Sequence, residues 1–196
     1  AILKSVLNHY LENIKPIMEK ETDALAKSER LFVKGIREMN SDKTYAPDAN
    51  STMRISYGQV ENYFPRDAVS YSYIATANGI LEKEDQNNPE FVVPPKLKEL
   101  ITEKNYGQYA DDNNELIVNF ITNNDITGGN SGSPIINGKG ELIGTAFDGN
   151  WESMSGDIAF EKKLQRTIGV DIRYILFIID KFAGASYLVN EMTLVK

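Results

Sequence analysis

Apolar residues recur at intervals of three and four over residues 1 to about 40 of the chain. This spacing is that of one face of an α-helix. The first stripe comprises Leu3, Leu7, Tyr10, Ile14 and Ile17, and the second comprises Leu25, Phe32, Ile36 and Met39. Pro16 should break or kink the first helix, because proline lacks an N–H and its ring clashes with the preceding turn. The chain therefore begins with a helical segment, which we expect to end before Asn40.

The pattern then changes to the alternation of apolar and polar residues that is typical of β-strands. It predicts strands at 53–58, 69–75 and 116–120, and a hairpin of 135–136 with 142–147 around Asn137-Gly138-Lys139-Gly140. A turn is expected at 47–50, a short helix at 96–104, and a final amphipathic helix at 170–182 with Gly184 as its cap. The expected fold class is mainly β with α.

Composition and charge narrow the classes of function. No run of 18 or more apolar residues occurs, so no membrane partner is expected. The net charge of −7 argues against a nucleic-acid partner. The lack of cysteine excludes disulfides, zinc–thiolate sites and a thiol nucleophile. The acidic run from Asp111 to Glu115 lacks the ligand spacing of a calcium loop. We therefore expect neither a metal nor a cofactor.

The string from Gly128 to Pro134, GGNSGSP, is the candidate for chemistry. Serine peptidases of the chymotrypsin fold carry their nucleophile in a similar turn, whose glycines permit a tight backbone path. Such a turn would aim the backbone N–H groups of Gly129 and Ser131 at the oxyanion of a tetrahedral intermediate. The alternative interpretation is a polar turn without chemistry. An α/β-hydrolase elbow does not fit, because Ser133 stands where its last glycine belongs.

Several longer strings carry a resemblance to one family. They are GGNSGSP, GELIG, FDGNWE, SGDI, LQRTI and VDIRYILFIIDKFAG, with PRDAVSYSY and FVVPPKLKEL before them. They are similar to serine peptidase family forty-six, the bacterial dipeptidyl peptidases. The resemblance covers nearly the whole chain.

That resemblance implies a chymotrypsin-like double barrel with a helical domain inserted between the barrels. Residues 1–46 would end the inserted domain, and 47–196 would form the C-terminal β-barrel lobe that carries the nucleophile. The resemblance further implies a homodimer that is periplasmic, cell-surface or secreted in a Gram-negative bacterium. Members of the family release dipeptides from the N-termini of oligopeptide substrates, using a Ser-His-Asp triad, and the resemblance implies the same for this protein.

Three positions match family roles. Ser131 matches the nucleophile, and Asp148 matches a carboxylate that holds the α-ammonium group of the substrate. Gly149 matches a position of the specificity pocket, which is arginine in members that cleave after Asp or Glu and glycine in members that prefer apolar residues. The resemblance therefore implies an apolar preference.

The catalytic His and Asp of the family belong to an N-terminal barrel that this sequence lacks. The only histidine, His9, lies in the first predicted helix among polar residues, so we interpret it as a solvated surface residue. We expect the chain to be a piece of a longer protein and to be inactive alone. An endopeptidase of the same fold and a non-catalytic peptide-binding domain are the alternatives. Asp148 favours an enzyme that requires a free N-terminus, which an endopeptidase does not need.

Overall fold

The computed structural model describes residues 2–43, 45, 52–156 and 158–195 and divides into two compact units, Ala1–Pro47 and Asp48–Lys196. The predicted turn at 47–50 lies outside the described ranges, and so does Asp157. No helix within the described ranges is both long and apolar enough to cross a membrane.

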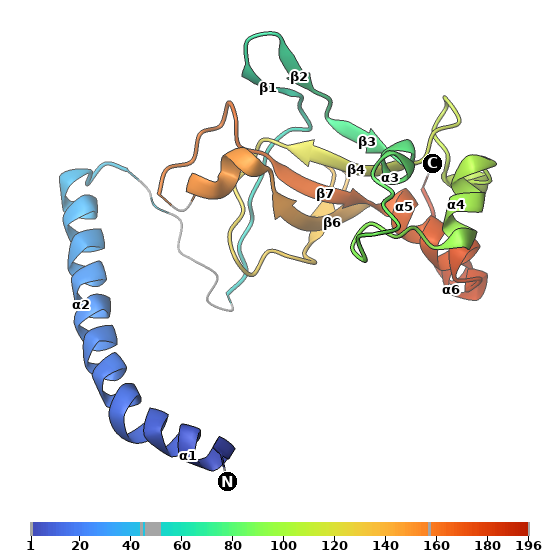
Figure 1. Cartoon of the computed structure of the whole chain (residues 1–196). Helices are drawn as coiled ribbons and strands as arrows, with labels where there is room; N and C mark the ends of the chain where they lie inside the picture. Colours follow the sequence, from blue (N-terminus) through green and yellow to red (C-terminus); the bar gives the residue numbers. More distant parts are fainter. Residues whose placement is uncertain (1, 44, 46–51, 157, 196) are drawn as a thin grey trace. The chain divides into compact units, whose positions relative to one another are not determined.

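The first unit is helical, as the apolar stripes predict (Figure 1, blue). It consists of α1 (Ile2–His9), a π-helical turn (Tyr10–Ile14) and α2 (Lys15–Met39). Pro16 lies in the first turn of α2, where proline needs no hydrogen-bond partner. The wider π-helical turn directly precedes it, and there the Lys15 N–H donates to the Tyr10 carbonyl. Pro16 thus interrupts the regular α-helix without ending it.

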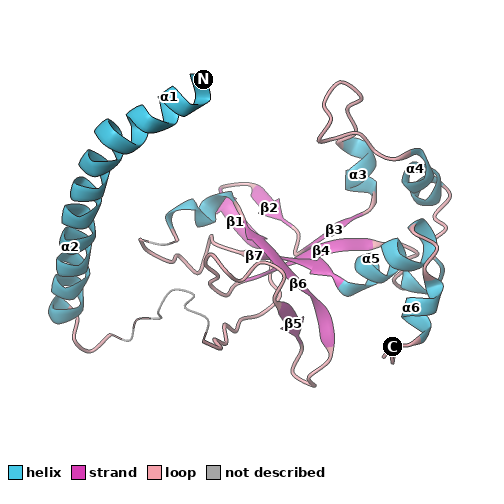
Figure 2. Ribbon diagram, turned by 90° about the horizontal axis from the view of Figure 1, so that it is seen from below, coloured by secondary structure: helices cyan, strands magenta, loops and turns pink. Residues whose placement is uncertain are grey.

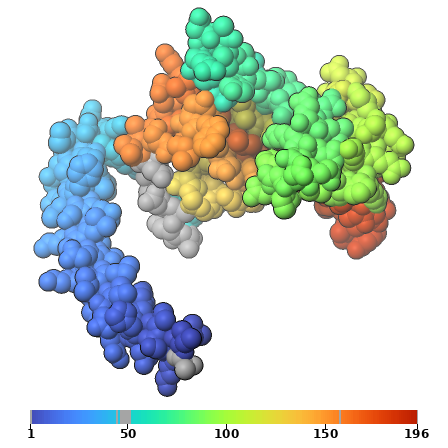
Figure 3. Space-filling model, in the orientation of Figure 1, coloured from blue at the N-terminus to red at the C-terminus, as the bar shows by residue number. Residues whose placement is uncertain are grey.

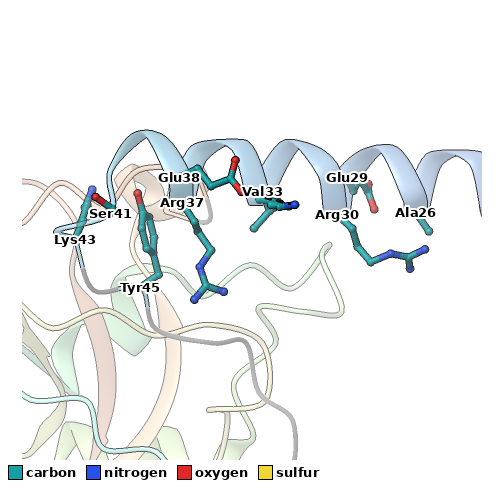
Figure 4. A pocket seen from close by; sticks show the side chains of 10 residues that line it. Ala26, Glu29, Arg30, Val33, Arg37, Glu38, Ser41, Lys43 and Tyr45 are labelled. Carbon is teal, nitrogen blue, oxygen red and sulfur yellow. Dashed lines mark ion pairs between the residues drawn. The ribbon is translucent and has the colours of Figure 1, made fainter.

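A shallow hollow of about 760 Å³ lies along α2 in this first unit (Figure 4). Its lining is largely charged, and the Lys34 ammonium lies 3.6 Å from the Glu38 carboxylate, an ordinary surface pair. The lining residues are Ala26, Glu29, Arg30, Val33, Lys34, Arg37, Glu38, Ser41, Lys43 and Tyr45.

The second unit is built on an antiparallel sheet, which has five strands in the described residues (Figure 2). Their order is β3 (Ile74–Thr76), β4 (Ile117–Thr122), β7 (Thr167–Asp171), β6 (Leu142–Gly149) and β5 (Pro134–Ile136). A separate hairpin is formed by β1 (Tyr63–Arg66) and β2 (Val69–Tyr71). The GGNSGSP string leads from the loop after β4 into β5 and lies beside β6, where the Gly132 N–H donates to the Ala146 carbonyl and the Ala146 N–H donates to the Ser133 carbonyl.

Helices gather at one end of this sheet (Figure 2). They are α3 (Asn78–Glu82), α4 (Pro95–Thr102), α5 (Ile172–Phe177) with a π-helical turn (Ile178–Phe182), and α6 (Ser186–Asn190), with a short 3-10 turn at Gly107–Tyr109. The main apolar core lies among them and includes Ala77, Leu97, Ile101, Tyr106, Leu116 and Phe177. Asp171 begins α5 by accepting from the Arg173 N–H, and its carboxylate also binds the Arg173 guanidinium.

Two glycines in the middle of the sheet lie against the Phe120 ring and one further neighbour each. A Cβ on Gly144 would lie 2.4 Å from the Val170 carbonyl oxygen and 2.9 Å from the ring, and a Cβ on Gly169 would lie 2.5 Å from the Ile135 Cδ1 and 3.1 Å from the ring. Glycine in a strand often marks such a close approach. The ring therefore fills the space that two side chains would otherwise occupy on neighbouring strands.

The structure confirms the expected fold class, a mainly β lobe with a helical segment before it and a helix after it. The hairpin, the short helix near 96–104 and the Gly184 cap, with φ +70°, are confirmed as well. The strand predicted at 53–58 is wrong, because this segment is irregular. The strand predicted at 69–75 is split into β2 and β3. The helix predicted from Val170 begins at Ile172 instead, because Val170 lies in β7, which ends at Asp171.

Candidate active site

The turn that carries Ser131 connects β4 to β5 and is closed by its own backbone. The Asn130 N–H donates to the Thr127 carbonyl at 3.1 Å, and the Ser133 N–H donates to the Asn130 carbonyl at 2.9 Å. Gly129 and Gly132 have φ values of +97° and +79°, a region that side chains disfavour. Both glycines are thus required by the path of the turn, as its sequence indicates.

Two backbone donors of this turn are unused within the ranges that the structure describes. Neither the Gly129 N–H nor the Ser131 N–H donates to a protein acceptor there. Both residues are exposed, so water satisfies these groups. A pair of free N–H groups beside a serine hydroxyl is the arrangement that stabilises an oxyanion during acyl transfer.

The Ser131 hydroxyl faces a bulge in β6. Its Oγ donates to the Phe147 carbonyl at 3.4 Å, while the Gly132 N–H donates to the Ala146 carbonyl at 2.7 Å. The pairing of β6 with β7 shifts register between Ala146 and Asp148, so Phe147 is the additional residue. Bulges beside active sites commonly redirect a residue in this way. Here the bulge turns the carbonyl of Phe147 to the serine.

A pocket of about 400 Å³ opens beside Ser131. It brings together the turn after β4, the end of β6 and the loop after β6, which lie next to one another as the yellow and orange surfaces of Figure 3. Its apolar walls include Ile126, Phe147, Met154 and Phe160. The predicted residues Ser131, Asp148 and Gly149 all line it. The sheet thus brings the nucleophile candidate and both substrate-binding candidates to one cavity.

Gly149 has room for no side chain. A Cβ at this position would lie 2.8 Å from the Ser153 Cβ and 3.1 Å from the Ser153 Oγ. Its φ is not in the left-handed region, so the backbone itself would accept another residue. The constraint is therefore steric, and it comes from the 3-10 turn Trp151–Ser155 that follows β6.

Asn150 holds the 3-10 turn Trp151–Ser155 and the loop that follows it in place. Its amide oxygen accepts from the Arg166 N–H at 2.8 Å and from the Ser153 hydroxyl at 2.7 Å. Its amide nitrogen donates to the Leu164 carbonyl and to the Glu152 carboxylate, each at 2.8 Å. One side chain thereby ties both ends of the loop 150–166 together.

The Arg166 side chain lines the pocket but is occupied by backbone oxygens. Its guanidinium is almost fully buried and donates to the carbonyls of Asn62, Lys162 and Gln165 at 2.8–2.9 Å and to that of Glu61 at 3.3 Å. It also lies 5.6 Å from the ring centre of Tyr63, whose pKa is raised by burial. These bonds of the Arg166 guanidinium tie the loop after β6 to the segment that contains Glu61 and Asn62.

Asp148 is exposed at the rim of the pocket. Its Oδ1 accepts from the Gly149 N–H at 2.8 Å, a local bond to the next residue. This bond leaves other lone pairs of the carboxylate directed to solvent. The structure thus contains a local bond that a purely structural aspartate would also make, and the role of Asp148 in binding an ammonium group stays a prediction.

His9 lies in the other unit, in α1, and is exposed as expected of a surface histidine. Its Nδ1 lies 3.3 Å from the Asn13 side-chain nitrogen. Among residues 2–43, 45, 52–156 and 158–195, no three His, Cys, Asp or Glu side chains gather in a way that could hold a metal.

Sequence reasoning missed four residues that shape this site: Asn150, Ser153, Arg166 and Arg54. Arg54 is distant in sequence, yet its guanidinium donates to the Asn130 side chain at 3.1 Å. Asn150 directly follows β6, which lines the pocket, and Arg166 directly precedes β7. Their places at the ends of strands could therefore have marked both as candidates from the sequence. Ser153 had no signal, because nothing in a sequence reveals which β-carbon approaches a glycine.

Comparison with known proteins gives a consistent result. The family model described as Peptidase S46 matches residues 1–194. A dipeptidyl-peptidase 7 of Phocaeicola vulgatus is 53% identical over 203 residues, covering 100% of this chain and 28% of that protein. An Asp/Glu-specific dipeptidyl-peptidase of Porphyromonas endodontalis is 51% identical over 168 residues, covering 86% of this chain and 23% of that protein.

A solved structure is similar along most of the chain. The crystal structure of Porphyromonas endodontalis DPP11 in complex with the dipeptide Arg-Glu has a TM-score of 0.79 and 48% identity, covering 90% of this chain and 26% of that one. The expected chymotrypsin-like fold is thereby confirmed. The chain spans about a quarter of the length of the relatives that it matches.

Proposed function

The chain belongs to the peptidase S46 family, and on that premise we propose that it is the nucleophile-bearing lobe of a longer serine dipeptidyl peptidase. The observation that carries the proposal is the turn at Ser131, with two free backbone N–H groups and an open pocket beside it. In this proposal, residues 1–46 end an inserted helical domain and 47–196 form the lobe.

The chemistry of the proposed reaction is acyl transfer. Ser131 Oγ attacks the carbonyl carbon of the second peptide bond of the substrate, and its proton passes to a histidine base. The negative oxygen of the tetrahedral intermediate accepts from the N–H groups of Gly129 and Ser131. The imidazolium then protonates the leaving amine, and water later hydrolyses the ester and releases a dipeptide.

The histidine and aspartate of the triad are proposed to lie outside this chain, in the remainder of the longer protein. Within the chain, the Ser131 hydroxyl donates to a backbone carbonyl rather than to an imidazole. The role assigned to this lobe is therefore to supply the nucleophile, the oxyanion donors and the pocket.

Asp148 is proposed to bind the α-ammonium group of the substrate. It lies on the same strand as the pocket residue Gly149, at the rim and exposed to solvent. An ammonium group bound there would set the distance from the N-terminus to the scissile bond at two residues. The endopeptidase alternative needs no such carboxylate.

The specificity proposed for the pocket is apolar. Its walls carry Phe147, Met154 and Phe160, and position 149 brings no side chain. The cationic residue of the pocket lining, Arg166, donates to four backbone carbonyls and lies 3.6 Å from the Glu61 carboxylate, so its guanidinium is engaged by the protein rather than open to a substrate carboxylate. A dipeptidyl-peptidase 7 and an Asp/Glu-specific dipeptidyl-peptidase match the chain at similar identity, so the proposed preference rests on the pocket residues alone.

The wider setting is proposed from the same family membership. The longer protein is a homodimer that acts on oligopeptides and is periplasmic, cell-surface or secreted in a Gram-negative bacterium. Size-exclusion chromatography with light scattering, and fractionation of the source cells, test these two points directly.

Hydrolysis of dipeptidyl fluorogenic substrates by the full-length protein tests the function. We expect turnover with a free N-terminus and an apolar second residue, and its loss in Ser131→Ala. Turnover that survives this substitution would contradict the proposal, because removal of such a nucleophile typically costs about 10⁶-fold in kcat.

A further inference from the structure

Residues 52–60 form a strap, by which we mean an irregular segment that lies against the chain from Thr122 to Asn130. Three kinds of contact hold it. The Asn123 side chain accepts from the Gln59 N–H at 2.9 Å, and the Asn123 N–H donates to the Gln59 carbonyl at 3.0 Å. The Ser56 hydroxyl donates to the Asp125 carbonyl. The strap thus follows the segment that leads into the Ser131 turn.

The contact is close enough to require glycine at one point. A Cβ on Gly58 would lie 2.6 Å from the Asn123 Oδ1 and 2.8 Å from the Asn124 N. No side chain fits between these atoms, so the strap lies directly on the backbone of the approach to the turn.

Arg54 connects the strap to the turn itself. Its Nη2 donates to the Asn130 Oδ1 at 3.1 Å, and the same oxygen accepts from the Thr127 N–H at 3.0 Å. A hydrogen bond from a guanidinium is roughly twice as strong as a neutral one, and Arg54 is half-buried, which limits screening by water. The Asn130 side chain is therefore fixed from two directions.

Asn130 directly precedes Ser131, so its backbone conformation sets the orientation of the peptide unit between them. The peptide unit between them carries the Ser131 N–H, one of the two free donors beside the hydroxyl. A rotation of Asn130 would turn that N–H away from the position of an oxyanion. Donors contribute to catalysis only when they are held toward the charge that develops.

We propose that Arg54 is a positioning residue that holds Asn130, and through it the Ser131 N–H, in the orientation of an oxyanion hole. The inference rests on the proposed function of Ser131 and adds a residue that the family assignment of the pocket does not include. Arg54 acts on the turn rather than on the substrate, so its effect should fall on kcat.

The test uses the full-length protein and a dipeptidyl substrate. We expect Arg54→Ala and Asn130→Ala each to lower kcat roughly 10–100-fold with KM changed less than about threefold, because one oxyanion donor is worth about 10²–10³ in rate. Asn130→Asp keeps both acceptor contacts, and Arg54→Lys keeps a charged donor, so both should retain more of kcat than the alanine variants do.

A second readout separates positioning from general damage. A dipeptidyl boronate forms a tetrahedral adduct with a serine, so its affinity should fall in parallel with kcat, while the affinity for the product dipeptide stays constant. Arg173 provides the control, because its guanidinium also binds a side-chain oxygen of another residue, that of Asp171, but it does not line the pocket. Arg173→Ala should lower the melting temperature and leave kcat unchanged.

The double variant Arg54→Ala/Asn130→Ala should be no slower than Asn130→Ala, since Asn130→Ala already removes the oxygen through which Arg54 would act. Losses that multiply, or an Arg54→Ala enzyme with wild-type kcat and boronate affinity, would overturn the inference while the proposed function stands. A wild-type protein without Ser131-dependent turnover would instead overturn the proposed function.

Discussion

The Ser131 hydroxyl donates to the carbonyl oxygen of Phe147, 3.4 Å away, at a bulge in β6. A carbonyl can accept the hydrogen bond but cannot take the proton, so this partner does not activate the serine. The candidate nucleophile thus has two free backbone N–H groups beside it, and in the described residues its hydroxyl bonds to a carbonyl and not to an imidazole. In the proposed function, the base therefore comes from outside this chain.

The 196-residue chain alone should be inactive for this reason. Incubation with a dipeptidyl fluorogenic substrate should give no turnover above a Ser131→Ala control, and an active-site phosphonate should not label Ser131. Turnover that depends on Ser131 would show that His9 or another group of this chain serves as the base.

Replacement of Asp148 in the full-length protein separates two roles. Asp148→Asn keeps an acceptor for the Gly149 N–H but removes the charge, whereas Asp148→Ala removes both. If Asp148 binds the substrate ammonium, both variants should lose about 2–5 kcal/mol of transition-state binding, measured as kcat/KM on free dipeptidyl substrates.

N-acetylated substrates provide the matching control, since wild type should cleave them as poorly as the variants cleave free ones. Equal cleavage of capped and free substrates would favour the endopeptidase alternative. An Asp148→Asn enzyme with wild-type kcat/KM would assign Asp148 a structural role instead.

Gly149→Arg, combined with Ser153→Gly to make room for the new β-carbon, should change the preference of the full-length protein toward Asp or Glu before the scissile bond. The arginine side chain would extend into the pocket and supply a fixed positive charge. Comparison of kcat/KM for Leu and Asp at that position checks it. A wild-type enzyme that already cleaves best after Asp or Glu would contradict the apolar pocket.

The same position carries a steric prediction. Gly149→Ala should destabilise the protein by about 1–3 kcal/mol, because its Cβ meets the Ser153 Cβ at 2.8 Å. Ser153→Gly should relieve most of this cost and Ser153→Ala little of it, since alanine keeps the β-carbon. Gly138→Ala, which meets no atom within 4 Å, is the control. Urea denaturation gives the free energy of unfolding of five proteins: the wild type, Gly149→Ala, Gly149→Ala with Ser153→Gly, Gly149→Ala with Ser153→Ala, and Gly138→Ala.

Asn150→Ala should also be destabilising. The substitution removes the acceptor of the Arg166 N–H and the donor to the Leu164 carbonyl. Each buried polar group that loses its partner costs about 1–3 kcal/mol. The expected result is a lower urea midpoint together with a higher KM, because the loop 150–166 forms a pocket wall. An unchanged midpoint would contradict the role assigned to Asn150.

The sequence was sufficient for features that depend on local pattern. The helical stripes, the hairpin and the glycines around Ser131 each follow from spacing or from backbone path, and the structure contains all three. The segment 53–58 shows the limit. Its alternation predicts a strand, yet the Arg54 and Ser56 side chains donate to Asn130 and to the Asp125 carbonyl, which a period of two cannot reveal.

The residues of the candidate site likewise include some that the sequence predicts and some that only the structure reveals. Ser131, Asp148 and Gly149 were found because they stand in recognisable strings, and they line one pocket. Ser153 and Arg54 matter through contacts with residues distant in sequence or in a neighbouring turn. Such contacts are set by the packing of the sheet and its loops and leave no periodic signal.

The central claim is that Ser131 is the nucleophile of a dipeptidyl peptidase. The most direct measurement is mass spectrometry of the full-length protein after reaction with a dipeptidyl phosphonate that has a free N-terminus. The account predicts one adduct per chain, mapped to Ser131, with simultaneous loss of turnover. An adduct on Ser133 or on another residue, or inhibition that persists in Ser131→Ala, would contradict it.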